Sequence, residues 1–488
     1  MGIMQVSAVS APRLKGVSSM SFSKGRAVVS AVLCASIVMS LTACDESAPA
    51  VSGGATTSPQ NTTATTTTNT LDDDINNPVD INQFVDNTQT LDNPNLVYFS
   101  HYDARVAGDI KPGVKLFEET YGGQIDYVNV AWGERFDKLQ MLISSDESPD
   151  LVDKEDVSFP CMMAKNVYED LTNYIDLSQP QWAGMDTLVN NYEWKGKHYY
   201  YPFTVNALPS VLIYNKTIFD KYSLDDPKDL YENGNWTWDT FKDIMRQFVE
   251  LNPDALGGVY GLLGSNIIIT TGTPLIGAEG GNIVNNMNDP NVERACQFLE
   301  ELRRENLAVR GEGMWSNETA PLTKGQTAFL GVGQWKITDY CKQTLKTGDE
   351  YGFVPYPKDP AADKYYYGST NFGYMVPKGS KNVQGAAAFI NIMRQCNTDP
   401  ELQAVVKESI MKDKKYSEEQ YEFLSSFEDV EKFDMVIDIY GGFGTDLTDV
   451  IDTFLVNLAF EQGEEQKTWS QIRSEYGPVV NATLEQYQ

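Results

Sequence analysis

Two loops near the start of the predicted folded region, residues 100–103 and 153–157, carry side chains that could bind a polar ligand. The candidates in them are His101, Tyr102, Asp103, Asp153 and Asp156. Carboxylates and an imidazole form hydrogen bonds with hydroxyl groups, and aromatic rings cover flat apolar faces. An ordinary turn, in which Asp103 only caps the next helix, explains the first loop equally well.

The elements that position these loops follow from an alternation of short apolar runs with amphipathic helical stretches. The predicted strands cover residues 96–99, 125–130 and 149–152. Strands separated by helices favour a parallel α/β sheet, in which ligands lie beyond the carboxyl ends of the strands. Both loops follow a predicted strand, and both are therefore expected at the edge of the sheet where ligands bind.

The charge balance excludes one class of partner. The 488 residues, of which 41% are hydrophobic, are enough for two or three domains with a substantial core. The chain has 38 Lys and Arg residues against 68 Asp and Glu residues, a formal net charge of −30. Such an acidic chain repels phosphate backbones and anionic lipid head groups, so we expect no nucleic-acid partner.

Cysteine and histidine are too sparse to predict a metal centre. There are 6 cysteines, none of them in a CxxC pair, and the histidines are His101 and His198. A structural or catalytic zinc ion needs clusters of these residues, so neither a metal nor a cofactor is predicted. The four cysteines beyond residue 44 are expected to be isolated thiols, with a disulfide framework as the alternative.

Residues 1–43 are typical of a secretory signal peptide. A basic stretch precedes the apolar run 27–41, which is shorter than the roughly 20 residues of a membrane span. The tetrapeptide LTAC at residues 41–44 resembles the bacterial lipobox, in which the signal is cut before an acylated cysteine. Cys44 is therefore the predicted lipidation site, against the alternatives of a secreted soluble protein or an uncleaved anchor.

A threonine-rich segment, residues 44–95, separates this site from the predicted folded region. Its composition offers almost nothing to bury, so we expect it to be disordered. About 45 flexible residues span on the order of 35–40 Å, enough to cross part of a cell wall. The sequence thus predicts a lipid-anchored protein on the extracellular face of the cell membrane of a Gram-positive bacterium.

Six segments between about residue 96 and residue 395 resemble, in the right order, the extracellular solute-binding proteins of ABC importers. They include WGERFDKLQMLISSDESPDLV, KGKHYYYPFTVNALPSVLIYNKTIFDKY, LTKGQTAFLGVGQW and GYMVPKGSKNVQGAAAFI. The resemblance is to the carbohydrate-binding, maltose-binding-protein-like group (family 1). It implies an α/β, two-lobed periplasmic-binding-protein-like fold of type II, with discontinuous lobes joined by hinge strands. The expected lobes are 96–206 with 345–395, and 207–344 with 396–488.

The resemblance also implies further ligand contacts. Trp335, in the segment GVGQW, matches a turn whose indole commonly stacks on a sugar ring in this family. The other implied contacts are Asn206, Glu279, Asn371 and Tyr440. Core packing is the alternative for Trp335, and a hinge role is the alternative for Asn206. We expect Trp132 to pack in the core, and the segment NWTWDTF to start a helix with Thr237 as N-cap.

The resemblance implies a monomeric lipoprotein that binds a carbohydrate between its lobes and delivers it to the permease subunits of an ABC transporter. No catalytic activity is expected. The alternatives are a peptide or polyamine as ligand of the same fold, a sensor or adhesin, and an extracellular glycoside hydrolase. A hydrolase would use two carboxylates about 5–10 Å apart. The chain contains neither a G-x-S-x-G nor an HExxH motif.

Overall fold

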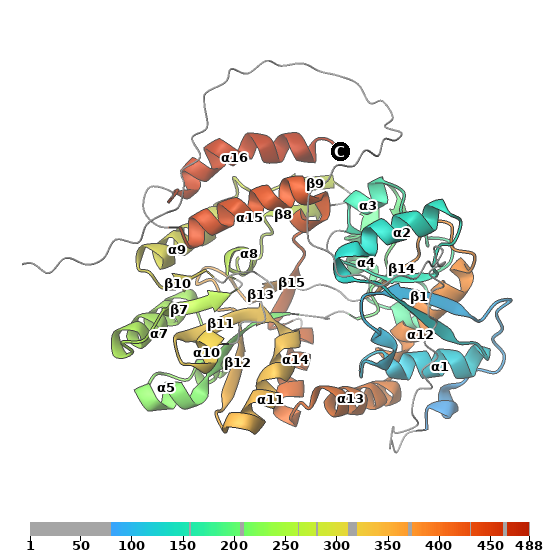
Figure 1. Ribbon diagram of the computed structural model, residues 1–488, viewed down its shortest axis with the longest axis horizontal. Helices are drawn as coiled ribbons and strands as arrows, with labels where there is room; N and C mark the ends of the chain where they lie inside the picture. The colour runs from blue at the N-terminus through green and yellow to red at the C-terminus, as the bar shows by residue number, and fades with distance from the viewer. Residues whose placement is uncertain are drawn as a thin grey trace, which may run out of the picture. The chain divides into compact units, whose positions relative to one another are not determined.

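Two main β-sheets with helices packed against them organise the chain (Figure 1). The computed structural model describes residues 80–155, 158–204, 209–261, 263–279, 282–310, 320–368, 373–429, 431–461 and 466–487. No helix within these ranges is long and apolar enough to cross a membrane. The predicted signal peptide and Cys44 lie outside the described residues.

The first sheet has the strand order β14-β3-β1-β2. Its parallel strands are β1 (Leu96–Ser100), β2 (Ile125–Asn129) and β3 (Leu151–Asp153). The apolar runs of the sequence form these strands because both sheet faces are covered, and the three strand predictions are confirmed. Helices α1 (Lys111–Tyr121) and α2 (Arg135–Ser144) connect the strands. The last strand, β14 (Tyr374–Met375), runs antiparallel to β3.

Late parts of the chain return to this first sheet. Helix α12 (Val383–Cys396) lies beside α1 in Figure 1, and the rings of Phe117 and Phe389 meet edge to face, 5.5 Å apart. Helix α13 (Pro400–Lys414) also contacts α1 and α12. The sequence analysis placed α13 in the second lobe, and its packing against the helices of the first sheet corrects that boundary.

The second sheet has the order β10-β7-β11-β6-β12. Its strands are β6 (Ser210–Asn215), β7 (Gly257–Gly261), β10 (Ala308–Val309), β11 (Thr327–Gly333) and β12 (Tyr351–Pro355). Strand β12 pairs antiparallel with β6 along its whole length. The expected start of the return segment at residue 345 is therefore wrong, because residues 351–355 still belong to the second sheet.

The helices on the second sheet's side of the chain include α7, whose start was predicted from the sequence. The helices are α5 (Lys216–Tyr222), α6 (Pro227–Glu232), α7 (Trp238–Leu251), α8 (Gly264–Ile269), α9 (Pro290–Arg304), α11 (Ile337–Thr347), α14 (Glu418–Ser425), α15 (Thr445–Ala459) and α16 (Trp469–Leu484). Thr237 caps α7 within a capping box, as predicted, and the Thr237 backbone N–H donates to Thr240 Oγ1 at 3.0 Å. Trp238 is buried and stacks on Phe298.

Smaller elements complete the described chain. They are α3 (Cys161–Ala164), α4 (Asp186–Asn190), α10 (Ala320–Thr323), the antiparallel pairs β4 (Glu193–Trp194) with β5 (Lys197–His198) and β8 (Ile276–Glu279) with β9 (Asn282–Asn285), and the parallel pair β13 (Tyr365–Gly368) with β15 (Phe433–Val436). Strand β13 leads from the second sheet toward β14 of the first sheet, so it forms part of a connection between the two.

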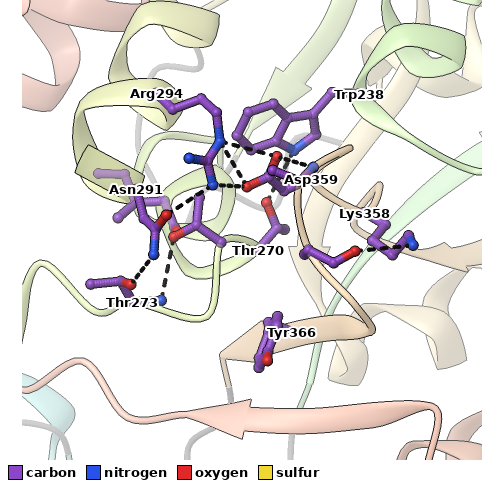
Figure 2. Close-up of polar contacts among 12 residues, drawn as sticks. Trp238, Thr270, Thr273, Asn291, Arg294, Lys358, Asp359 and Tyr366 are labelled. Atoms are coloured by element: carbon purple, nitrogen blue, oxygen red, sulfur yellow. Dashed lines mark hydrogen bonds and ion pairs between the residues drawn. The ribbon is translucent and has the colours of Figure 1, made fainter. Parts of the chain in front are cut away.

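The loop between β12 and β13 is fixed by a buried ion pair, which Figure 2 shows. Arg294 of α9 donates from Nε to both oxygens of Asp359, at 3.1 and 3.2 Å, and the Asp359 side chain is fully buried. Arg294 also donates to Asn291 Oδ1 at 3.1 Å. The Trp238 backbone N–H donates to the Lys358 carbonyl at 3.1 Å. Helices α7 and α9 together therefore hold this loop.

Residues 80–95 are ordered, which corrects the predicted extent of the tether. A 3₁₀ turn, η1 (Ile81–Phe84), contacts α1, and the Tyr121 hydroxyl donates to Gln89 Oε1 at 2.5 Å. Asn382 Nδ2 donates to the carbonyls of Asn93 and Asn95 at 3.0 and 2.8 Å. These contacts join residues almost 300 positions apart, and the local composition of the segment does not reveal them.

The four cysteines of the described region are free thiols. They are Cys161, Cys296, Cys341 and Cys396. Burial raises the pKa of Cys296 and raises that of Cys396 to about 12, so both are protonated at neutral pH. This confirms the prediction of isolated thiols over a disulfide framework.

Candidate functional site

The carboxyl ends of β1, β2 and β3 bring polar and aromatic side chains to one edge of the first sheet. Because these strands are parallel, the residues that follow them emerge on the same side. The side chains concerned are His101 and Tyr102 after β1, Trp132 after β2, and Asp153 at the end of β3. The sequence analysis predicted three of the four as ligand contacts.

Asp153 is the most strongly perturbed acid at this edge. The Tyr98 hydroxyl donates to its Oδ1 at 2.8 Å, and the Ser100 hydroxyl donates to its Oδ2. Burial nevertheless raises the pKa of Asp153 from 3.8 to about 7, against the effect of both hydrogen bonds. Near neutral pH this carboxyl group exists in both protonation states, so it can donate or accept a hydrogen bond with a ligand hydroxyl.

We expect Asp153→Asn to change how stability depends on pH. The native state holds this proton more tightly than the unfolded chain does, so the stabilisation is full below about pH 4 and is lost as pH rises toward 7. Between about pH 4 and pH 7, the free energy of unfolding of the unmodified protein should fall relative to that of Asp153→Asn by up to roughly 1.4 kcal/mol per pH unit. Urea denaturation of both proteins measures it. Equal pH slopes for the two proteins would contradict the raised pKa.

Three aromatic rings lie together at the same edge. The ring centroids of His101 and Tyr102 are 4.7 Å apart, and those of His101 and Trp132 are 4.6 Å apart at 78°. The Tyr102 side chain is 38% exposed and that of Trp132 is 57% exposed. The prediction that Trp132 packs in the core is wrong, because Trp132 lies in a 3₁₀ turn, η3 (Trp132–Glu134), beyond the end of β2.

His101 is neutral at pH 7 because burial lowers its pKa. Its Nδ1 is buried and has no hydrogen-bond partner within the described part of the chain.

Asp103 uses both of its carboxylate oxygens in hydrogen bonds within the chain. It caps the turn η2 (Ala104–Val106) and accepts from Arg105 through both carboxylate oxygens, at 2.9 and 2.8 Å. These contacts favour the capping role for Asp103 over a role as ligand contact.

A small open pocket with a cavity volume of about 20 Å³, room for about one water molecule, lies at this edge. Its lining residues are Phe99, Ser100, His101, Arg135, Phe136, Leu139, Val152, Asp153, Glu155 and Tyr168. The pocket thus combines aromatic and apolar walls with hydroxyl, imidazole, guanidinium and carboxyl groups. Such a lining offers hydrogen bonds and apolar contact to the part of a ligand that reaches its mouth.

Trp335 lies at the end of a strand of the second sheet. Strand β11 ends at Gly333 and the chain turns into η6 (Gln334–Lys336), where Trp335 is 44% exposed. The indole lies against Gly333, since a Cβ atom there would be 1.8 Å from the Trp335 carbon Cζ3. The Gln334 N–H donates to the Pro209 carbonyl at 3.0 Å and fixes the turn. The exposure of the indole argues against core packing, and the ligand role of Trp335 stays a prediction.

Two further predicted contacts belong to the second sheet's side of the chain. Glu279 is exposed at the end of β8. Tyr440 begins η8 (Tyr440–Phe443), and its hydroxyl donates to Asp452 Oδ1 at 3.3 Å. The ligand roles of Glu279 and Tyr440 stay predictions. The remaining predicted residues, Asp156, Asn206 and Asn371, lie outside the described part of the chain.

Trp132, Arg135 and Glu155 also lie at this candidate site and were not among the predicted ligand contacts. Arg135 and Glu155 line the pocket and form an ion pair in which both side chains are mostly buried, at 14% and 17% exposure. The sequence does contain a signal for Trp132. This residue follows β2 as His101 follows β1 and as Asp153 ends β3, so all three lie at the carboxyl ends of parallel strands.

Comparison with known proteins connects this arrangement to one family. The family model described as bacterial extracellular solute-binding protein matches residues 114–404, more than half of the chain. A carbohydrate ABC transporter substrate-binding protein of Streptococcus pneumoniae is 23% identical over 307 residues. The match covers 59% of this chain and 58% of that protein, so the chain spans less than two thirds of this relative.

Two solved structures are similar in fold. The GacH receptor of Streptomyces glaucescens is 19% identical with a TM-score of 0.57, over 81% of this chain and 99% of that one. The sugar-binding protein MalE of Xanthomonas citri is 14% identical with a TM-score of 0.60, over 80% of this chain and 98% of that one. These similarities confirm the predicted two-lobed α/β fold of type II.

Proposed function

We propose that this chain, which belongs to the family of bacterial extracellular solute-binding proteins, captures a sugar or an oligosaccharide and delivers it to the permease of an ABC transporter. The observation that carries the proposal is a set of exposed aromatic rings at strand ends. Trp132, Trp335 and Tyr102 are 57%, 44% and 38% exposed. Exposed rings match the apolar faces of a sugar, and a carboxyl group such as that of Asp153 can bind its hydroxyl groups.

The relatives favour carbohydrate over a peptide or a polyamine as ligand. The Streptococcus pneumoniae relative is a carbohydrate ABC transporter substrate-binding protein, and the GacH receptor was solved in complex with acarbose. MalE of Xanthomonas citri is a sugar-binding protein. The chain's own pocket supports the same ligand class, because it offers both hydrogen-bonding and apolar walls.

The ligand would lie between two lobes that close around it by hinge motion. We assign residues 80–204 with 373–414 to the first lobe, and residues 209–368 with 417–487 to the second. The pairing of β12 with β6 and the packing of α13 on α1 support these bounds. The first lobe would then contribute Asp153 and its aromatic neighbours, and the second would contribute Trp335.

The N-terminal part of the chain would hold the two ligand-binding lobes at the membrane. Lipid on Cys44 and the segment between it and residue 80 would tether a monomer to the extracellular face of the cell membrane. A tethered protein releases its ligand near the permease at a high effective concentration.

We propose binding without turnover. A glycoside hydrolase needs two carboxyl groups free to act on the sugar. In the pocket, both carboxylate oxygens of Glu155 accept hydrogen bonds from Arg135. Glu155 is therefore not free to act as the second carboxyl group beside Asp153. This contact supports release of the ligand unchanged.

A thermal-shift screen with the purified chain lacking residues 1–43 tests the proposal. Monosaccharides and linear oligosaccharides form one arm, and peptides and polyamines form the other. A ligand present at about 100 times its Kd stabilises the folded state by roughly 2.7 kcal/mol, so at least one sugar should raise the Tm clearly. Chromatography should recover that sugar intact. Shifts with peptides or polyamines alone, or turnover of the sugar, would contradict the proposal.

A further inference from the structure

The indole of Trp132 is covered on one face by an arginine. The guanidinium carbon of Arg135 lies 3.4 Å from the ring centroid of Trp132, a cation–π stacking distance. Arg135 Nη1 also donates a hydrogen bond to the backbone carbonyl of Trp132. Arg135, the first residue of α2, thus holds both the ring and the backbone of a side chain that is otherwise 57% exposed.

Arg135 is in turn held by an acid from a different strand end. Arg135 Nε donates to Glu155 Oε1 at 2.6 Å, and Nη2 donates to Oε2, so the pair is bidentate. The Glu155 backbone N–H donates to Ser158 Oγ at 3.1 Å, and Ser158 is fully buried. The loop after β3 is therefore connected through Glu155 and Arg135 to the turn after β2 that carries Trp132.

A third contact limits the remaining freedom of the indole. The His101 ring meets Trp132 nearly at right angles, with centroids 4.6 Å apart. An arginine on one face and an imidazole ring packed at a steep angle define the orientation of the indole. An aromatic side chain held in this way contributes to binding without losing much conformational freedom.

We infer that Glu155 and Arg135 are positioning residues that hold Trp132 as the stacking platform of the first lobe for a ligand ring. The inference rests on the proposed function. The loop after β3 has no tryptophan of its own. It would act on the ligand indirectly, by orienting a tryptophan that follows β2.

Arg135→Lys tests this arrangement because lysine keeps the charge but loses the planar fork and the stack. Using the sugar with the largest thermal shift, we expect calorimetry to give a Kd about tenfold higher for Arg135→Lys and for Trp132→Ala. In a double-mutant cycle, Arg135→Lys should add almost nothing to Trp132→Ala, because its effect passes through the indole. Glu155→Gln should weaken binding in the same indole-dependent way.

A matched control is the pair between Arg246 of α7 and Glu305, the residue after α9, which is also bidentate, at 2.6 and 2.7 Å. Arg246→Lys should leave the Kd unchanged. Independent, additive effects of Arg135→Lys and Trp132→Ala, or an unchanged Kd in either variant, would overturn the inference. If these outcomes occur while Trp335→Ala still weakens binding, the inference fails and the proposed function stands. If no sugar binds the unmodified chain, the proposed function itself fails.

Discussion

Replacing Trp335 with alanine should weaken sugar binding by about thirtyfold or more. Truncation of a tryptophan at the centre of a binding site commonly costs roughly 2 kcal/mol or more, and each 1.4 kcal/mol is about tenfold in Kd. Because the side chain is 44% exposed, the variant should fold normally and its Tm without ligand should change little. Calorimetric titration with the best sugar measures the Kd directly.

Gly333→Ala tests the same residue without removing it. Gly333 has φ −72° and ψ 152°, which alanine adopts freely, so the added methyl group acts mainly by displacing the Trp335 indole. We expect a loss of affinity that approaches that of Trp335→Ala. Tyr174→Ala is the control, since Tyr174 is 48% exposed and does not line the pocket. A full affinity in both Trp335→Ala and Gly333→Ala would remove Trp335 from the site.

Arg294→Met should lower the free energy of unfolding by about 3 kcal/mol. Asp359 is fully buried, and removal of Arg294 leaves its charge uncompensated, which costs roughly 3–5 kcal/mol in buried pairs. We expect the lower end of that range because Arg294 is 36% exposed and water can enter in its place. Urea denaturation followed by circular dichroism measures the change.

The matched control for Arg294→Met is Lys381→Met, which breaks an ion pair with Asp146 at the surface. Both partners of that pair are more than 60% exposed, at 66% and 77%. Exposed pairs contribute about 0–1 kcal/mol, so the control should be nearly neutral. Similar small effects of the two substitutions would show that the Arg294–Asp359 contact does not hold the loop between β12 and β13.

The sequence predicts the first sheet well because its strands are local apolar runs. Each strand contains a short apolar run whose residues are mostly buried, so local composition is sufficient to identify β1, β2 and β3. The start of α7 was predicted for a similar reason, since the capping box around Thr237 involves residues only three positions apart. Family resemblance then supplied the two-lobed arrangement that no local pattern contains.

Features that depend on distant contacts could not be predicted from the sequence. Residues 80–95 look like a disordered tether in composition, yet Asn382 binds the carbonyls at their carboxyl-terminal end. Strand β12 lies in the second sheet because it pairs with β6, more than 130 residues earlier. No local pattern near residue 345 indicates that pairing, so the predicted lobe boundary lies too early in the chain.

The site was predicted in part, and its errors have a physical pattern. His101, Tyr102 and Asp153 could be predicted because each lies at the carboxyl end of a strand. The parallel topology alone brings such residues to one edge of the first sheet. Trp132 was assigned to the core because a tryptophan is usually buried, while its exposure depends on where β2 ends. Asp103 was left between two roles; its pairing with Arg105 supports the cap, and its ligand role stays a prediction.

A crystal structure of the chain with its best sugar would show directly where the ligand binds. We expect one sugar ring stacked on the Trp335 indole, with ligand hydroxyl groups hydrogen-bonded at the carboxyl edge of the first sheet near Asp153. A sugar bound elsewhere, with Trp335 and Asp153 both exposed to water, would contradict this expectation.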